Sequence, residues 1–389
     1  MKRTKILALL LAALLLFSCL TGCAAKSQSA QSTEQPAASQ QESEPAAEAV
    51  AEPELEAEAQ PQTVSFTDSV GRVVEIPAEL TKVAPSGAVA TMFLSIIAPE
   101  YMMTVHSTPD ANEQMYLDAR LAELPETGQM YGSKASLNLE ALLASGAELI
   151  IDLGDKKGDM VGDLDALQEQ VGIPVIFIEA DLVHMADAFR TLGSILSGKA
   201  ARGEQLAAFV DETLTMAAEN SAKVTEDMRV SVLYTSGTDG LSANAKGSTQ
   251  SQVLEMVGAE NAVIVDDVSN KGGGNLINLE QLYRFDPDVI VFCEGSIYDT
   301  VADEAAWSTL RAVGNGAYYE IPGAPYNWLS NPPSLNMLLG VWWLGNLLYP
   351  DVYDYDMAEK TQQIYELLWG YELSADEAHQ LLANSTAKR

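Results

Sequence analysis

Residues 138–151 read NLEALLASGAELII, and the same frame returns 140 residues later as NLEQLYRFDPDVIV in residues 278–291. In each copy an Asn stands where it can cap a short helix, and a Glu falls in the first helical turn. A Gly or Pro break then separates the helix from an apolar run typical of a buried strand. This period predicts two like-built lobes, because solenoid repeats recur roughly every 20 to 50 residues. Two lobes in turn predict a cleft that binds a ligand.

The N-terminus has the pattern of a secretory signal. Three of the first five residues are basic, an apolar run extends from Ile6 to Leu16, and the segment Leu20-Thr21-Gly22-Cys23 follows. This last segment resembles the bacterial lipobox, whose cysteine carries a diacylglyceryl group. The resemblance implies that a signal peptide of residues 1–22 is removed and that Cys23 carries a lipid anchor. A plain signal-peptidase site and an uncleaved anchor helix are the alternatives, although the apolar run is short for a membrane span.

Cysteine usage agrees with an exported lipoprotein. The chain contains 3 cysteines, of which Cys19 would leave with the signal and Cys23 would carry the lipid. Only Cys293 would remain, so we expect no intramolecular disulfide in the mature chain. Cys293 follows the apolar run 289–292, where a small buried side chain is a better interpretation than a reactive thiol.

Residues 23–62 are predicted to form a lipidated, disordered, acidic tether. Ala, Ser, Gln, Glu and Pro dominate it, and eight glutamates lie between Glu34 and Glu58. Repulsion among these charges would extend the tether and space the folded part from the bilayer. The whole chain has a formal net charge of −33. This charge disfavours nucleic acid or anionic lipid as a partner.

The rest of the chain is predicted to be an α/β protein. Two alternating runs between Val64 and Pro77 predict a hairpin, and the alternation of strands and helices that follows predicts two α/β lobes with mainly parallel sheets. Residues Ala200–Ala222 contain no proline and predict one helix of about 33 Å. We therefore expect an N-terminal lobe over 63–199, a connecting helix over 200–222, and a C-terminal lobe over 223–389 with a helical extension. The predicted strands lie near residues 103–106, 149–153, 175–178, 230–234, 263–265 and 289–292.

Several motifs beyond the tether together resemble the class III substrate-binding proteins of ABC importers. They are the Thr67–Arg72 hairpin ending in Pro77, both Asn-Leu-Glu elements, the start of the strand at Asp286–Val291, and the turn at Ala312–Gly316. The family serves importers of iron-siderophores, haem, cobalamin and related metal complexes. The resemblance implies two α/β lobes joined by one rigid helix, with the ligand in a shallow groove between the lobes and only modest closure. Residues 200–222 match the connecting helix.

The resemblance also implies a role for the repeated glutamates. In this family a glutamate at the motif position of each lobe meets arginines of the membrane permease. Glu140 and Glu280 are therefore expected to dock the protein onto an ABC permease, which works with an ATPase. The alternative is that each carboxylate only complements the positive end of its helix, worth about 0.3–1 kcal/mol. We expect the receptor to be a monomer that is lipid-anchored to the cell membrane on its extracytoplasmic side.

Candidate ligand contacts follow from the rule that ligands of α/β sheets gather at loops after the carboxyl ends of strands. Tyr326 and Trp328 flank Asn327, and the two rings either form a rigid wall against the ligand or pack under a loop. The first lobe departs from the family pattern where Lys82-Val83 replaces the usual Arg-Val, so the resemblance does not place the first contact loop. The candidate residues are Ser86, His106, Tyr131, Ser133, Lys134, Tyr234, Lys271, Tyr326, Asn327 and Trp328.

The histidine count argues against a bare transition metal as the ligand. The chain has 3 histidines and no His-rich acidic loop, whereas a bare zinc or manganese ion needs several His and carboxylate ligands. A chelated metal needs at most one protein ligand, and His106 is either that contact or a hydrogen-bonded structural residue. Tyr131, Tyr234 and Lys134 suit an anionic siderophore. We therefore expect an iron(III)-siderophore-type chelate as the ligand, with no resident cofactor or metal.

An oxyanion is the alternative ligand. Lys134 and Lys271, near Ser133, Ser236 and backbone amides, would suit it equally well. The segments 327–336, 340–344 and 348–350, together with the C-terminal extension, resemble a branch of the same family that includes molybdate and tungstate receptors.

No catalytic site is expected. The chain has no Gly-x-Ser-x-Gly elbow and no His-Glu-x-x-His zinc motif, and its histidines are few for acid-base chemistry. An exported hydrolase and a structural lipoprotein are the remote alternatives, and the latter would gain no stability from a small molecule.

Overall fold

The computed structural model describes residues 62–132, 135–270, 272–330 and 332–387. It begins with the expected hairpin, in which β1 (Thr63–Thr67) pairs antiparallel with β2 (Val73–Pro77). The carboxylate of Asp68, which is fully buried, accepts a hydrogen bond from the N–H of Arg72 at 2.9 Å and pairs with its guanidinium at 3.2 Å. Arg72 also donates to the carbonyl of Val175 at 2.8 Å, which fastens the hairpin to the first sheet. The signal, Cys23 and the tether lie outside the described residues.

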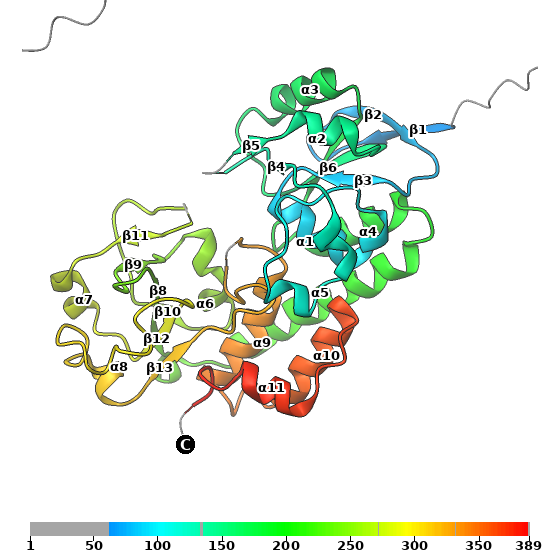
Figure 1. Cartoon of the computed structure of the whole chain (residues 1–389). Coiled ribbons are helices and arrows are strands. Elements are labelled where there is room, and N and C mark those ends of the chain that lie inside the picture. The colour runs from blue at the N-terminus through cyan, green and yellow to red at the C-terminus, as the bar shows by residue number, and fades with distance from the viewer. Residues whose placement is uncertain (1–61, 133–134, 271, 331, 388–389) are drawn as a thin grey trace, which may run out of the picture. The chain divides into compact units, whose positions relative to one another are not determined.

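The first sheet is parallel and contains β3 (Val83–Pro85), β6 (Leu149–Gly154) and β7 (Val175–Glu179) in the order β3-β6-β7. All six residues of β6 are buried, as its apolar sequence requires. The helices of this part of the chain are α1 (Ala88–Ile97), α2 (Leu139–Ala144), α3 (Met160–Val171) and α4 (Met185–Ile195) (Figure 1). A short antiparallel pair, β4 (Gly128–Gln129) and β5 (Ser136–Leu137), lies nearby in sequence.

The predicted strand at 103–106 is wrong. This part of the chain forms two isolated bridges only: Met102 pairs with Val83, and Val105 pairs with Glu126. Because the two residues pair with different partners, no continuous ladder develops. The first strand of this sheet, β3, lies earlier in the chain and was not predicted; it is three residues long and ends at Pro85.

The second sheet is mixed, with parallel pairing at its centre. β8 (Ser231–Ser236) pairs parallel with β12 (Val289–Phe292), which pairs parallel with β13 (Tyr318–Glu320). On the other side, β9 (Ser242–Ala243) and β11 (Asn275–Leu276) add antiparallel, and β10 (Glu260–Asn261) pairs parallel with β8. The associated helices are α6 (Gln252–Met256), α7 (Leu279–Phe285) and α8 (Arg311–Gly314).

The predicted strand at 263–265 is also wrong, because the pairing occurs a few residues earlier in β10. The side chain of Asn261 accepts a hydrogen bond from the N–H of Val263 at 2.9 Å. This local turn takes the backbone out of the ladder.

The connecting helix is confirmed as α5 (Ala200–Ser221), 22 residues long. It contacts α1 and α4, which precede it in the chain, and α6 and α9 (Asn336–Leu348), which follow it. The guanidinium of Arg202 donates to the carbonyls of Ile96 at 3.2 Å and Leu367 at 2.7 Å. It therefore joins the carboxyl ends of α1 and α10 (Met357–Trp369), and α11 (Ala375–Leu381) completes the C-terminal extension. Within the described part of the chain, no helix combines the length and apolar character needed to cross a membrane.

The repeated frame is confirmed in both copies. The side chain of Asn138 accepts from the N–H of Ala141 at 3.1 Å, and Asn278 accepts from Gln281 at 2.9 Å, so each Asn caps its helix, α2 or α7. Each helix is followed by a residue with positive φ, Gly146 at 72° and Asp286 at 31°. The following strands are β6 and β12.

A glycine contact fixes the packing of α4 on α5. A Cβ added at Gly203 would lie 2.5 Å from the carbonyl oxygen of Phe189 and 2.8 Å from Cα of Gly193. We expect Gly203→Ala to lower the free energy of unfolding by about 1–3 kcal/mol, because two backbones would have to separate. The higher helix propensity of Ala, about 1 kcal/mol, offsets only part of this loss.

Urea denaturation followed by circular dichroism measures the Gly203→Ala effect. The control is Gly158→Ala, where nothing lies within 4 Å of the added carbon, and its stability should stay within about 0.5 kcal/mol of the natural protein. A Gly203→Ala variant as stable as this control would contradict the close helix crossing.

Candidate functional site

The carboxyl ends of β3 and β6 bring Ser86 and Asp152 together. Ser86 directly follows β3, and its hydroxyl donates a hydrogen bond to Oδ1 of Asp152 in β6. Both residues are buried, and Oδ2 of Asp152 has no hydrogen-bond partner in the described part of the chain. Burial raises the pKa of the Asp152 carboxyl, and the ammonium of Lys157 and the bond from Ser86 oppose this rise. A buried carboxyl with an unbonded oxygen is costly, so it marks this edge as a candidate site.

β4 places His106 and Tyr131 beside Ser86. The N–H of Gly128 donates to the carbonyl of His106 at 2.9 Å, and the N–H of Met130 donates to the carbonyl of Ser86 at 2.8 Å. Tyr131 directly follows Met130. Three of the predicted ligand residues therefore gather at one edge of the first sheet.

His106 is tied into its surroundings. Its N–H donates to Oγ1 of Thr91 in α1 at 3.3 Å, and its Nε2 lies 3.0 Å from the hydroxyl of Ser107. Burial lowers the pKa of His106, and the nearby Glu126 carboxylate opposes this effect. The ring is therefore neutral at pH 7. Its Nδ1 atom is buried and has no hydrogen-bond partner among the described residues, so the structure agrees with either interpretation of His106.

Tyr131 and Lys157 supply hydrogen-bond donors at the same edge. The Nζ atom of Lys157 lies 4.6 Å from the centroid of the Tyr131 ring, which is a cation–π contact. Burial, and then the carboxylates of Asp152 and Asp163, raise the pKa of Tyr131, so its hydroxyl stays protonated. Sequence reasoning missed Lys157. It lies only two residues beyond Asp155, in a loop whose Gly154-Asp155 start has an ordinary interpretation as a turn.

The N-terminus of α1 completes this group. The residue before the helix is Gly87, which provides no side-chain cap, and the first turn contains no acidic residue. Among the described residues, no group accepts a hydrogen bond from the N–H of Ala88, Val89 or Ala90. A Cβ at Gly154 would lie 3.9 Å from both Lys157 Nζ and a methyl of Val89, so Lys157 stands beside the first turn. We call Ser86, Tyr131, Asp152, Lys157 and this helix start the α1 edge. Its donors suit an anionic oxygen.

The second sheet brings Tyr234 and Asn327 together around Cys293. The hydroxyl of Tyr234 lies 3.8 Å from the sulfur of Cys293, and Nδ2 of Asn327 lies 3.9 Å from the same atom. Tyr234 is fully buried, and burial raises the pKa of the Cys293 thiol to about 11. The expected burial of Cys293 is confirmed, and the raised pKa disfavours the reactive thiolate. Asn327 also accepts from the N–H groups of Leu329 and Ser330, which shapes the turn after Tyr326.

Tyr326 and Trp328 are core side chains. Their exposed fractions are 8% and 1%. The indole N–H of Trp328 donates to the carbonyl of Ala324 at 3.4 Å. Burial raises the pKa of Tyr326, whose hydroxyl bonds to Ser95 in α1. The structure therefore agrees with packing under a loop and not with an exposed wall. Three other candidates, Ser133, Lys134 and Lys271, lie outside the described residues.

The two motif glutamates are exposed on their helices. Glu140 lies in the first turn of α2 and Glu280 in the first turn of α7, and neither forms an ion pair among the residues that the structure describes. Large apolar side chains near them are also exposed: Leu143 at 54%, Leu279 at 40% and Tyr283 at 45%. A free carboxylate flanked by exposed apolar groups is a surface suited to a protein partner.

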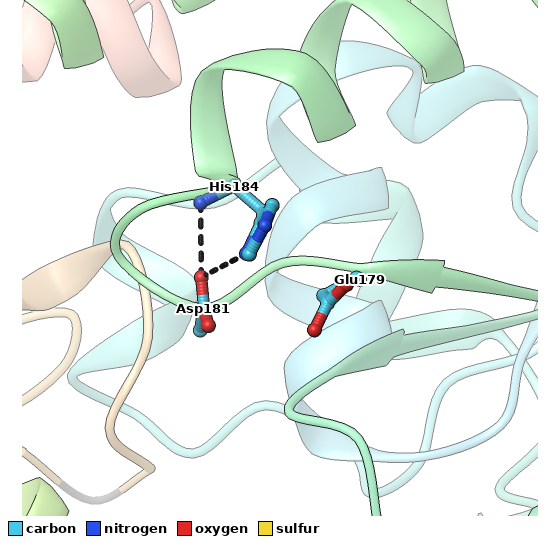
Figure 2. A group of neighbouring side chains, drawn as sticks. All are labelled: Glu179, Asp181 and His184. Atoms are coloured by element: carbon cyan, nitrogen blue, oxygen red, sulfur yellow. Dashed lines mark hydrogen bonds and ion pairs between the residues drawn. The ribbon is translucent and has the colours of Figure 1, made fainter. Parts of the chain in front are cut away.

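A second cluster at the carboxyl end of β7 was not predicted. Figure 2 shows Glu179, Asp181 and His184, whose carboxylate oxygens and imidazole nitrogen lie within 4.8 Å of one another. Asp181 Oδ1 accepts from Nδ1 of His184 at 2.7 Å and from its N–H at 2.9 Å, and this contact raises the pKa of His184. Glu179 pairs with Lys156 at 2.6 Å. These bonds explain the cluster as part of the turn that precedes α4.

A cavity of about 670 Å³ lies elsewhere, among the ends of α1, α5 and α10. Arg202 and Trp369 line it, but none of the predicted ligand residues does. The gathering of donors at the α1 edge, rather than cavity size, therefore defines the candidate site.

Two α/β sheets linked by one long helix, with polar side chains gathered at a carboxyl edge, define a two-lobed substrate-binding fold. The chain belongs to the periplasmic binding protein family, whose model matches residues 104–325. The expected membership is confirmed.

Individual relatives agree with this family. A Bacillus subtilis protein named as an ABC transporter substrate-binding lipoprotein, YhfQ, is 24% identical over 220 residues, which are 54% of this chain and 66% of that protein. An ABC transporter solute-binding protein from Sulfurospirillum deleyianum has a TM-score of 0.75 at 26% identity and covers 82% of this chain and 99% of its own. A Haemophilus influenzae protein solved with molybdate has a TM-score of 0.64 at 18% identity, and the match covers 80% of this chain and 99% of that protein.

Proposed function

We propose that this protein is the extracytoplasmic substrate-binding lipoprotein of an ABC importer and delivers an iron(III)-siderophore-type metal chelate to the permease. Membership of the periplasmic binding protein family over residues 104–325 carries the proposal. The capped Asn-Leu-Glu helix present in both halves supports it, because each copy exposes a carboxylate that has no ion-pair partner among the described residues.

The chemistry of the α1 edge supports an anionic, oxygen-rich ligand. Tyr131 offers a hydroxyl group, Lys157 offers a positive charge, and the start of α1 offers backbone N–H groups, while the hydroxyl of Ser86 is used in its bond to Asp152. A ferric siderophore presents hydroxamate, catecholate or carboxylate oxygens that such donors can bind. Because the chelator fills the coordination of the iron, the protein needs to supply no metal ligand.

A molybdate or tungstate oxyanion is the second candidate ligand. The start of a helix with free N–H groups beside a lysine is the arrangement that binds small oxyanions. The molybdate-bound protein of related fold is consistent with this alternative, although at 18% identity the likeness concerns the fold alone.

The proposed partners follow from the same function. Glu140 and Glu280 would contact a permease that works with an ATPase, and Cys23 would anchor the chain through lipid to the outer side of the cell membrane. The acidic tether of residues 23–62 would hold the folded part near its partner. The receptor would act as a monomer and would catalyse no reaction.

A thermal-shift screen tests the proposal. The panel contains ferric siderophores of the hydroxamate and catecholate classes, haem, cobalamin, molybdate and tungstate. A true ligand at 100 times its dissociation constant should add about 2.7 kcal/mol to the free energy of unfolding. Stabilisation by a ferric chelate supports the first ligand, and stabilisation by oxyanions alone replaces it with the second. No response to any member would favour a structural lipoprotein or a hydrolase.

A further inference from the structure

Among the described residues, the carboxyl of Asp152 is a buried acidic group with one oxygen left unexplained. Asp152 lies within β6 and is 3% exposed. One of its two carboxylate oxygens, Oδ1, accepts a hydrogen bond from the hydroxyl of Ser86. The other oxygen, Oδ2, has no hydrogen-bond partner among the residues that the structure describes. Buried polar atoms are almost always bonded, so an unbonded one requires a partner or a function.

The position of Asp152 links it to the start of α1. Ser86 bonds the Asp152 carboxyl and directly precedes Gly87, the residue before α1, so this bond ties β6 to the segment that leads into the helix, where the N–H groups of Ala88 to Ala90 have no acceptor among the described residues. Lys157 stands beside the first turn of this helix. The helix start attracts an anion, and an ionised carboxylate beside it would repel that anion.

We propose that Asp152 is a specificity-determining residue for the ligand, and that its Oδ2 carries a proton and donates a hydrogen bond to an anionic oxygen bound at the start of α1. The inference rests on the proposed function and deepens it. Burial, which disfavours the ionised carboxyl, acts in the direction that the proposal needs. The ligand class is an oxygen anion, either a carboxylate, catecholate or hydroxamate oxygen of a ferric chelate or an oxygen of a tetrahedral oxyanion.

Two substitutions separate this role from the alternatives. Asp152→Asn keeps the shape, keeps an acceptor for Ser86 and presents an N–H donor that does not titrate. Asp152→Leu removes the donor. Dissociation constants are measured by titration calorimetry with ferric citrate, a ferric catecholate, molybdate and tungstate between pH 5 and pH 8.5. Calorimetric unfolding of each variant identifies any loss of fold, and Asp354→Asn, an exposed position, is the control.

The ligand that binds should keep its affinity within about threefold in Asp152→Asn and lose about tenfold or more in Asp152→Leu. In the natural protein the affinity should be full below the pKa of Asp152 and should fall as pH rises through it. The ratio of the natural to the Asp152→Asn constant isolates this effect, because both proteins share the other titrating groups: His106, Tyr131, Lys157, Asp155 and Asp163.

Each outcome decides the proposal. Asp152→Asn binding tenfold more weakly at every pH would mean that an ionised Asp152 accepts a hydrogen bond, and equal binding by Asp152→Leu would mean that the ligand does not touch it. Both results overturn this inference while leaving the transport function intact. A natural protein that binds none of the four probes overturns the ligand class. Carboxyl ¹³C chemical shifts of the free protein give a further check, since an Asp152 that titrates near the ordinary value of about 3.9 would overturn it directly.

Discussion

The double variant Glu140→Ala/Glu280→Ala is expected to abolish ligand uptake while leaving the dissociation constant of the ligand within about twofold of the natural value. Both carboxylates are exposed, unpaired among the described residues, and located in the first turns of α2 and α7. Neither belongs to the α1 edge. Removing both charges should therefore remove the electrostatic contact with a permease and leave the ligand site unchanged. Uptake of labelled ligand by cells that carry the transporter measures the first quantity, and calorimetry measures the second.

The matched control replaces two other exposed glutamates, one near each sheet. Glu169 in α3 and Glu304 before α8 have no ion-pair partner in the described part of the chain, and Glu169→Ala/Glu304→Ala should transport normally. Each single motif variant should give intermediate uptake, since one docking contact remains. Loss of ligand affinity in the double motif variant, or normal uptake by it, would contradict the docking assignment. Unchanged helix content is expected, because the Asn caps remain.

Trp328→Ala is expected to lower the free energy of unfolding by about 3–5 kcal/mol. The side chain is 1% exposed and is among the largest fully buried groups of the molecule. Its indole N–H donates to the carbonyl of Ala324 at 3.4 Å, and its backbone N–H donates to the carbonyl of Pro322 at 3.0 Å. A Cβ added at Gly340 of α9 would clash with the backbone carbonyl oxygen of Trp328. The cavity left by the indole would therefore lie under a backbone that cannot close around it.

Guanidinium chloride denaturation measures this loss, and Trp328→Phe, which keeps a ring in the same place, should cost much less. Without denaturant, and at a temperature at which Trp328→Ala remains folded, the dissociation constant of the ligand should stay within about threefold of the natural value. If stability were unchanged and affinity fell tenfold, Trp328 would be a ligand wall after all, and its burial would need another explanation.

The sequence predicted those elements whose signals are local. The Asn caps of α2 and α7, the hairpin β1-β2 and the uninterrupted helix α5 each depend on residues close together in the chain. The parallel strands β6 and β12 were also predictable, because strands covered on both faces are apolar throughout.

The errors have non-local causes. The segment 103–106 contains strand-like residues but pairs with two separate partners, and the turn made by Asn261 shifts the expected strand to β10. Burial of Trp328 depends on α9, which periodicity cannot place. Ser86, His106 and Tyr131 were predicted from strand ends, whereas Lys157 and Asp152 were missed. An aspartate inside an apolar strand gives no sign of whether its oxygens are bonded.

The two capped helices have one further consequence. Each carries its exposed glutamate between an Asn cap and a residue of positive φ, and neither the glutamates nor these flanking residues belong to the α1 edge. Under the proposed function, docking and ligand binding therefore depend on separate residues. Under the proposed function, such a receptor can be retargeted: loop exchange at the α1 edge would change its cargo, and the same transporter would still accept delivery.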